Sequence, residues 1–238
     1  MRFNRFLTLL ASVGLLAGSA AVVAPATAAE TLSTTVVIEL EKNRLRYNDT
    51  FDIEGQVQTT YQGEQLGVES AEVVLQRQFP GRGWVAVGNQ TGNGWDGKFT
   101  FYGVPAKQNA AYRVVYAGET RDYDGAQLTF TPSTSAAKGI RVLRDFKLDS
   151  RRQNGGMVLL GRVVPTYKNR VVQVLQRKCE RCRWTAFTKV RTNKRSRFSV
   201  RVALPPRVGP TWDYRVKTPA DKAFLASPSR QYLYVYRY

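Results

Sequence analysis

The sequence repeats itself at a spacing of about 100 residues. VVLQR at 73–77 recurs as QVLQR at 173–177, and a tryptophan, Trp84 or Trp184, follows the arginine by seven residues in both places. Three further matches are Gly55-Gln56-Val57 with Gly161-Arg162-Val163, Phe99 with Phe198, and Tyr112-Arg113-Val114 with Tyr214-Arg215-Val216. Two copies of one domain explain this spacing better than a short-period solenoid does. The repeat therefore defines architecture, although it does not identify a ligand.

The amino terminus has the pattern of an export signal. Arg2 and Arg5 precede an apolar stretch at 6–16, and Ala26-Thr27-Ala28 matches the A-x-A cleavage pattern. The stretch is short for a membrane span, although an uncleaved anchor is the alternative. We expect a signal peptide at 1–28 and a secreted mature chain, extracellular or associated with the cell wall, with no membrane span.

The mature chain has the pattern of short strands, because β-branched and aromatic runs alternate with turn residues. The runs lie near 33–40, 50–58, 71–78, 84–90, 97–102, 111–117 and 126–131, and again near 144–149, 156–164, 170–177, 184–191, 196–203, 212–218 and 231–237. Seven strands in about 100 residues are typical of an immunoglobulin-like sandwich. We predict an all-β protein with two tandem immunoglobulin-like β-sandwich domains, at 29–143 and 144–238.

Alternation predicts which side chains form the cores. Phe198, Val200 and Val202 alternate with polar residues, as on a strand that covers a core on one side. We expect the repeated tryptophans and tyrosines to fill the space between the sheets. A ligand-binding platform is the alternative for these rings.

These motifs together resemble the immunoglobulin-like repeats of secreted actinobacterial proteins. The similarity covers nearly all of the mature chain, twice, and its motifs are more specific for fold than for function. The resemblance implies a spacer, an adhesion module or a carrier appended to exported proteins, and it supplies no catalytic residues. The second copy departs from the pattern at its cysteine pair and at Ser196-Arg197-Phe198.

Cys179 and Cys182 are the chain's two cysteines, and they flank the position of the Pro80-Gly81 turn of the first copy. We expect a structural disulfide, because an exported protein meets an oxidising environment. A redox site would need a nearby helix start, and zinc would need about four ligands in a chain that has no histidine. We therefore expect no metal and no cofactor.

Charge is divided unequally between the copies. Residues 30–143 hold 11 lysines and arginines against 13 aspartates and glutamates, a net charge of −2, whereas residues 144–238 hold 23 against 5, a net charge of +18. The fold does not require this charge, since one copy lacks it and self-repulsion costs stability. General solubility is one interpretation, and a surface that binds polyanions is the other.

We predict a polyanion-binding stripe on the second copy. If the runs at 184–191 and 196–203 pair as a hairpin, six cations fall on its outer side and turn: Lys189, Arg191, Lys194, Arg195, Arg197 and Arg201. Anionic cell-wall polymers or other polyanions would bind there with a steep dependence on salt. We expect no sequence-specific recognition of nucleic acid and a monomeric protein.

Enzymatic activity is not expected. The absence of histidine excludes Ser-His-Asp triads and histidine-based zinc catalysis. Glu119, Asp122 and Asp124 form an acidic loop, which we interpret as solvated, with a calcium site at 122–125 as the alternative. The leading hypothesis is a secreted, non-enzymatic binding or adhesion module for acidic polymers, and a structural spacer or carrier without a specific ligand is the alternative. An unfamiliar enzyme is a distant third.

Overall fold

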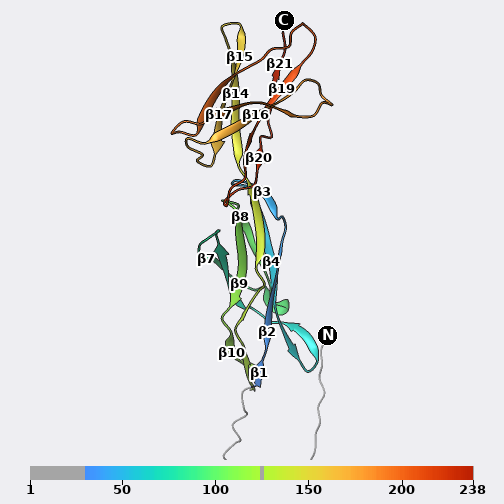
Figure 1. Cartoon of the computed structure of the whole chain (residues 1–238). Helices are drawn as coiled ribbons and strands as arrows, with labels where there is room; N and C mark the ends of the chain where they lie inside the picture. The colour runs from blue at the N-terminus through green and yellow to red at the C-terminus, as the bar shows by residue number, and fades with distance from the viewer. Residues whose placement is uncertain (1–29, 124–125, 238) are drawn as a thin grey trace, which may run out of the picture.

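The computed structural model describes residues 30–123 and 126–237, which form two β-rich lobes placed end to end (Figure 1). The predicted signal peptide and Asp124 lie outside the described residues. Apart from one 3-10 turn, η1 (Gly94–Asp96), the elements are strands, so the protein is an all-β protein with several sheets. In this part of the chain no helix has the length and apolar character needed to cross a membrane.

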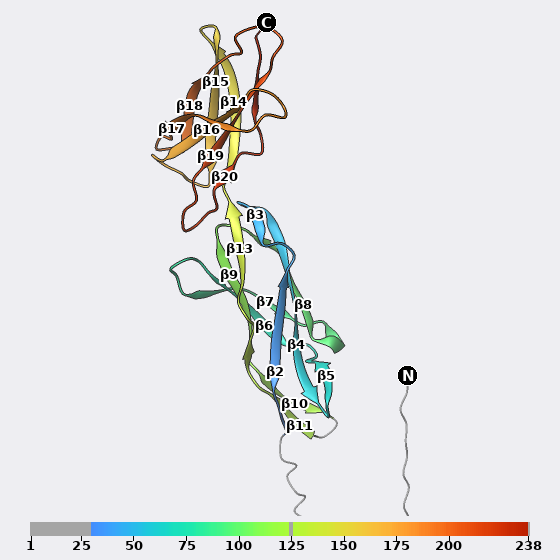
Figure 2. The same ribbon diagram turned by 45° about the vertical axis from the view of Figure 1, so that its right-hand side comes forward.

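The amino-terminal lobe contains three sheets. One contains β2 (Thr34–Leu40), β4 (Thr50–Tyr61), β5 (Glu64–Gly67) and β8 (Lys98–Pro105). The second has the order β3 (Arg44–Arg46), β13 (Lys138–Leu143), β9 (Ala110–Tyr116), β6 (Glu72–Gln78) and β7 (Trp84–Thr91), with β12 (Ser133–Thr134) also paired to β9. A small third sheet joins β1 (Glu30–Leu32), β11 (Ala126–Phe130) and β10 (Glu119–Tyr123) at the far end of the lobe (Figure 2).

The carboxy-terminal lobe contains two sheets. The first is β14 (Asp145–Gln153), β15 (Gly156–Val164) and β18 (Arg197–Val202). The second is β17 (Thr185–Arg191), β16 (Val171–Arg177), β19 (Trp212–Thr218) and β20 (Ser227–Pro228), and β21 (Leu233–Val235) also pairs with β19. Thirteen of the fourteen predicted runs contain one strand at or near the expected bounds, and the last, 231–237, contains the shorter β21.

Each lobe has its own apolar core, and the repeated residues occupy matching places in the two. Phe99 and Tyr112 are buried in the first core, and Phe198 and Tyr214 in the second. The repeated glycines lie directly opposite the repeated phenylalanines, at Gly55–Phe99 and Gly161–Phe198. A Cβ on either glycine would lie 2.4 Å or less from the ring, so the ring fills the space that a side chain would need.

The prediction that the repeated tryptophans belong to the cores is wrong. Trp84 and Trp184 are half-buried and lie outside both core clusters. The cause is a β-bulge, which shifts the alternation by one residue in each copy. In the second copy Val174 pairs with Thr188 and Leu175 with Ala186, so Phe187 is the extra residue. Phe187 packs edge-on against Tyr214 with ring centroids 5.2 Å apart, while the neighbouring Ala186 is exposed.

A single residue, Arg144, separates the last strand of the first lobe from the first strand of the second. The loop 219–226 of the second lobe packs back onto the first lobe, where Phe224 is buried in the core. The Asn109 backbone N–H donates to the Ala223 carbonyl at 2.8 Å, and the Leu225 N–H donates to the Val142 carbonyl at 2.8 Å. The two lobes are therefore joined by more than their covalent connection, since the Phe224 side chain of the second lobe is buried in the apolar core of the first.

Arginines add polar contacts across this junction. Arg46 donates to the Arg144 carbonyl at 3.1 Å and to the Pro228 carbonyl at 3.0 Å. Arg144 itself is buried, and its guanidinium lies 3.9 Å from the centroid of the Phe224 ring and donates to Asp221 at 2.8 Å. Burial raises the pKa of the Asp221 carboxyl, but the Arg144 guanidinium and backbone N–H donors outweigh burial and hold it below 3.8.

We expect Phe224→Ala to destabilise the amino-terminal lobe, although residue 224 belongs to the second repeat. Removal of a buried phenylalanine costs about 3–5 kcal/mol. Urea unfolding of the full chain, followed by hydrogen exchange of β9 and β13, measures this loss. Exposed Tyr236→Ala serves as the control. A loss confined to the second lobe would contradict the shared core.

We expect Asp221→Asn to lower stability by about 1–3 kcal/mol at neutral pH, since it weakens the partner of a buried guanidinium. A carboxyl whose folded-state pKa is depressed contributes stability above its unfolded pKa and loses it as the pH falls through the folded value. The difference between wild type and variant should therefore shrink below pH 3.8. Denaturant midpoints measured between pH 7 and pH 2.5 test this, and a gap that widens in acid would refute it.

Candidate functional site

The outer face of the sheet β14–β15–β18 brings cations of the second repeat close together. Lys147 lies directly opposite Arg162, and Arg162 lies directly opposite Arg197. All three side chains are exposed. Opposed residues on neighbouring strands have their Cβ atoms about 4.5–5.5 Å apart, and like charges in such pairs are destabilising. We call these three residues the cationic row.

The cationic row forms one wall of a groove of about 530 Å³. Lys147, Arg162, Arg191 and Arg197 line it together with a single carboxylate, Asp149. Leu160, Asn193 and Ser199 add apolar and hydrogen-bonding surface. Four cations against one carboxylate give the groove a net positive charge, with room for an extended chain rather than a deep pocket for a small molecule.

The first repeat carries a neutralised version of the same row. Val37, Gln56 and Lys98 are the directly opposed residues there. Lys98 pairs with Asp96 at 2.7 Å, and Gln56 donates to the Asp96 carbonyl. When Phe99 is aligned with Phe198, Arg195 takes the place of Asp96. The second repeat has therefore gained cations and lost the carboxylate that would have neutralised them.

The turns before the row differ by one residue in length, since the Asn93 N–H donates to the Lys98 carbonyl and the Asn193 N–H to the Arg197 carbonyl, but one left-handed position is common to both. Gly97 and Ser196 occupy the same place and both have a φ of +62°. Ser196 is buried, and its hydroxyl accepts a hydrogen bond from the Tyr167 N–H at 2.8 Å. The Asn193 side chain accepts from the N–H groups of Arg195 and Arg197. This turn orients Arg197 toward the groove.

The structure brings together only part of the predicted stripe. Arg191 and Arg197 line the groove, and Lys194 and Arg195 are exposed in the turn at its end. Arg201 lies on the same outer face of β18 and donates to the Asn154 carbonyl at 2.7 Å. Lys189 is exposed on β17, which belongs to the other sheet.

The predicted pairing of the runs at 184–191 and 196–203 is therefore wrong, because β17 pairs with β16 and β18 with β15. The chain crosses from one sheet to the other at the turn 192–196. Lys147 and Arg162 were not foreseen, since they become neighbours of Arg197 only once the sheet is assembled. The sequence feature that could have indicated Arg162 as a site residue is its positive charge next to the repeated Gly161. Polyanion binding by these residues stays a prediction.

A second surface of the lobe joins aromatic rings to arginines. Arg215 lies 4.3 Å and Arg177 4.9 Å from the centroid of the Trp184 ring, and Tyr232 meets the same ring edge-on. Burial, followed by the charge of Arg177, lowers the pKa of the Arg215 guanidinium below its usual value. In the first repeat Arg113 lies 4.3 Å from Trp84. In both repeats, therefore, the tyrosine of the Tyr-Arg-Val motif is buried in the core. The arginine of the same motif lies over the tryptophan ring on the outer side of the sheet.

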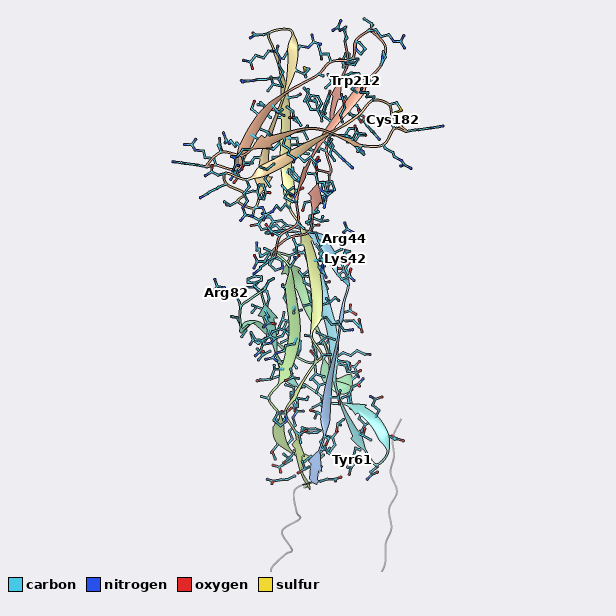
Figure 3. All side chains as sticks on the ribbon, viewed as in Figure 1. Lys42, Arg44, Tyr61, Arg82, Cys182 and Trp212 are labelled. Carbon is cyan, nitrogen blue, oxygen red and sulfur yellow. A yellow bond between two sulfur atoms is a disulfide. The ribbon has the colours of Figure 1, made fainter. Side chains whose placement is uncertain are left out.

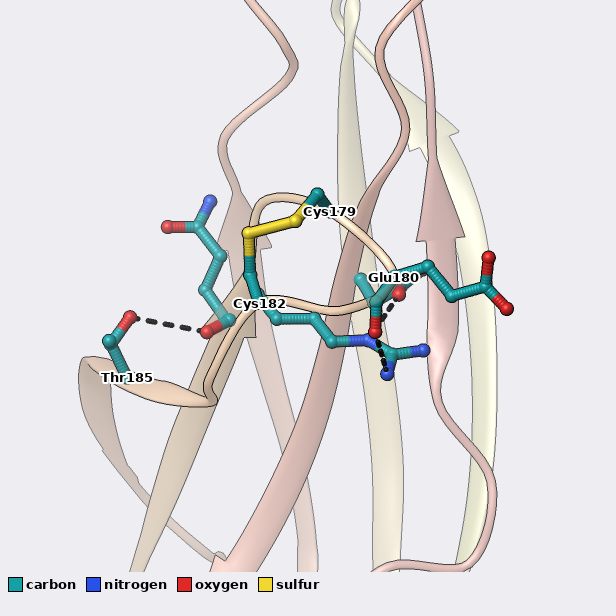
Figure 4. The surroundings of a disulfide bond; sticks show 7 residues. Cys179, Glu180, Cys182 and Thr185 are labelled. Carbon is teal, nitrogen blue, oxygen red and sulfur yellow. Dashed lines mark hydrogen bonds and ion pairs between the residues drawn. A yellow bond between two sulfur atoms is a disulfide. The ribbon is translucent and has the colours of Figure 1, made fainter.

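Cys179 and Cys182 form a disulfide in the turn after β16 (Figure 4). The Cys182 N–H donates to the Cys179 carbonyl, and the Arg82 N–H donates to the Phe79 carbonyl in the matching turn of the first repeat. Arg177 donates to the Glu180 carbonyl at 2.9 Å within the disulfide turn. Figure 3 labels Cys182 at the side of the lobe, among many nitrogen-bearing side chains.

The prediction that Glu119 and Asp122 lie in a solvated loop is wrong, because both belong to strand β10, which pairs with β11. Glu119 accepts from the Tyr116 hydroxyl at 2.7 Å and from Arg121 at 2.6 Å. Asp122 is exposed, and Asp124 is outside the described residues. Over 30–123 and 126–237 no group of three or more histidine, cysteine, aspartate or glutamate side chains is arranged to hold a metal ion.

Comparison with known proteins gives a distant similarity. No protein-family model matches the chain, and no curated protein matches it. Among solved structures the chain is similar to the crystal structure of a tetra-tandem repeat in the extending region of a large adhesion protein, with 11% identity and a TM-score of 0.32. The match covers 85% of this chain and 48% of the other, so the chain spans about half the length of that structure.

We expect Trp184→Ala to cost only about 1–2 kcal/mol, because it removes two cation–π contacts on a half-exposed face, each worth about 0.5–1 kcal/mol. Phe198→Ala, in the core of the same lobe, should cost about 3–5 kcal/mol. Chemical denaturation of both variants measures the difference. Equal losses of stability in the two variants would indicate that Trp184 is a core residue.

Proposed function

We propose that the chain is a secreted, non-enzymatic binding or adhesion protein. In this proposal it consists of two tandem immunoglobulin-like β-sandwich modules, 29–143 and 144–238, and its basic second module binds acidic polymers at a cell surface. The observation that carries the proposal is the cationic row, Lys147, Arg162 and Arg197, in which like charges face one another directly across three strands.

A row of this kind costs stability, because each directly opposed pair of like charges is unfavourable by a fraction of a kcal/mol. The first repeat has the same cross-strand arrangement with Val37, Gln56 and a neutralised Lys98 in these places. The fold therefore does not need the row. A bound anionic chain would offset the repulsion and would release its own counterions, which favours binding at low salt.

The spacing of cations along the outer face of the sheet supports a polymer as the ligand. Arg151 and Arg201 lie on either side of Val158, four residues along the strand from Arg162. Four residues of strand span about 13 Å, so cations are present at both ends of a face that an extended chain can follow.

A spacer is the second candidate function, and the lobe junction favours it. The single residue between β13 and β14 and the burial of Phe224 in the first lobe limit the relative movement of the lobes. A spacer needs this stiffness but has no use for the cationic row. One protein could have both functions. Binding of an anionic polymer by the cationic row distinguishes the binding module from a spacer.

We expect the triple change Lys147→Ser, Arg162→Ser and Arg197→Ser to reduce affinity for anionic polymers at least tenfold at low salt. The slope of log affinity against log salt concentration should fall by about 2, because three cations no longer displace counterions. Stability should stay unchanged or rise by about 0.5–1 kcal/mol as repulsion is removed. Retention of the full chain on a teichoic-type polymer, an anionic glycan and a nucleic acid, each at several salt concentrations, provides the measurement.

The matched control is Arg181→Ser, Arg183→Ser and Arg207→Ser, which removes the same charge from exposed positions outside the sheet β14–β15–β18. The control should retain most of the affinity. Equal loss in both triples would attribute binding to net charge alone. Unchanged retention in the row variant, with the fold intact, would favour the spacer.

A further inference from the structure

A second cationic pocket lies at the junction of the lobes, away from the cationic row. It has a volume of about 550 Å³. Thr166, Lys168 and Arg170 line it from the loop between β15 and β16, and Asp221, Lys222 and Ala223 line it from the loop after β19. Arg144, the residue that connects the lobes, completes the lining.

The charge of this pocket is unbalanced. Asp221 is its single carboxylate, and that carboxylate is shared by Arg144 at 2.8 Å and Arg170 at 3.0 Å. Lys168 and Lys222 are exposed, and neither forms an ion pair with a described carboxylate. Four cations thus face one anion, and like charges held this close favour the uptake of a further anion.

Arg144 supplies an independent observation. Its side chain is 4% exposed, and its guanidinium lies between the Phe224 ring at 3.9 Å and the Tyr167 ring at 4.8 Å. Only Nη2 is bonded to Asp221, while Nε and Nη1 have no hydrogen-bond partner within the described residues. Buried donors are normally satisfied. Because these two donors are shielded from solvent, Arg144 adds a fixed positive charge to the pocket lining rather than a direct contact with an anion.

We propose that this junction pocket binds a multiply charged oxyanion, a phosphate or sulfate group. The anion bridges Lys168 and Arg170 on one loop to Lys222 on the other. The second loop is the one that buries Phe224 in the first lobe and bonds to Asn109. Occupancy therefore tightens the contact between the lobes, since any ligand that binds only the folded junction stabilises it. The proposal is independent of the function assigned to the cationic row.

The test titrates inorganic phosphate, and separately sulfate, into the full chain by calorimetry at constant ionic strength set with sodium chloride. The expected result is saturable binding of one equivalent and a melting temperature that rises with phosphate but not with sodium chloride. Amide shifts in NMR should be confined to residues 166–170 and 221–223. Binding of several equivalents, or effects matched by sodium chloride, would overturn the proposal.

Two variants localise the site. Lys168→Ser with Lys222→Ser removes exposed cations and should raise the dissociation constant at least tenfold while the fold is kept. The variant lacking the cationic row should bind phosphate as the wild type does. Unchanged binding in the lysine variant overturns the junction site and leaves polymer binding by the row untouched. A phosphate group on a polymer is distinguished from the free ion by retention on a teichoic-type polymer, which the lysine variant should weaken only if the polymer reaches the junction.

Discussion

The pairing of Gly161 with Phe198 across β15 and β18 determines which side chains of these two strands face solvent. Phe198 covers Gly161 so closely that no side chain fits there, and this contact fixes the register of β15 against β18. Because side chains alternate along a strand, a slip of one residue would turn every outward residue inward. The register that buries Phe198 is the one that sets Arg162 opposite Arg197. A core contact thereby determines the geometry of a charged surface.

Local patterns in the sequence predict local structure well here. Strand positions, the inward face of β18 and the cysteine turn follow from alternation and turn residues, and the disulfide is present. The position of Trp184 does not follow, because the bulge at Phe187 changes the phase of alternation without any glycine or proline to mark it. The extra residue of this bulge, Phe187, packs against Tyr214.

Pairing between distant strands was harder to foresee. β17 and β18 are adjacent in the chain with a short turn between them, which is typical of a hairpin, yet they belong to different sheets. The row that contains Lys147, Arg162 and Arg197 therefore draws on three strands spread over fifty residues. The burial of Phe224 in the other lobe was equally hard to predict, because no pattern near residue 224 indicates that its partners precede residue 143. The charge asymmetry between the repeats could be predicted from the sequence, because it does not depend on which strands pair.

The single-residue connection at Arg144 has a mechanical consequence. When the ends of the molecule are pulled apart, β13 and β14 carry the load in series through the single residue Arg144, and no slack linker absorbs extension first. The hydrogen bonds of Arg46 and the embedded Phe224 act in parallel with that connection. They must shear before the lobes can bend relative to each other. Tension applied at one end is thus transmitted to the other lobe while the relative orientation of the two lobes is preserved.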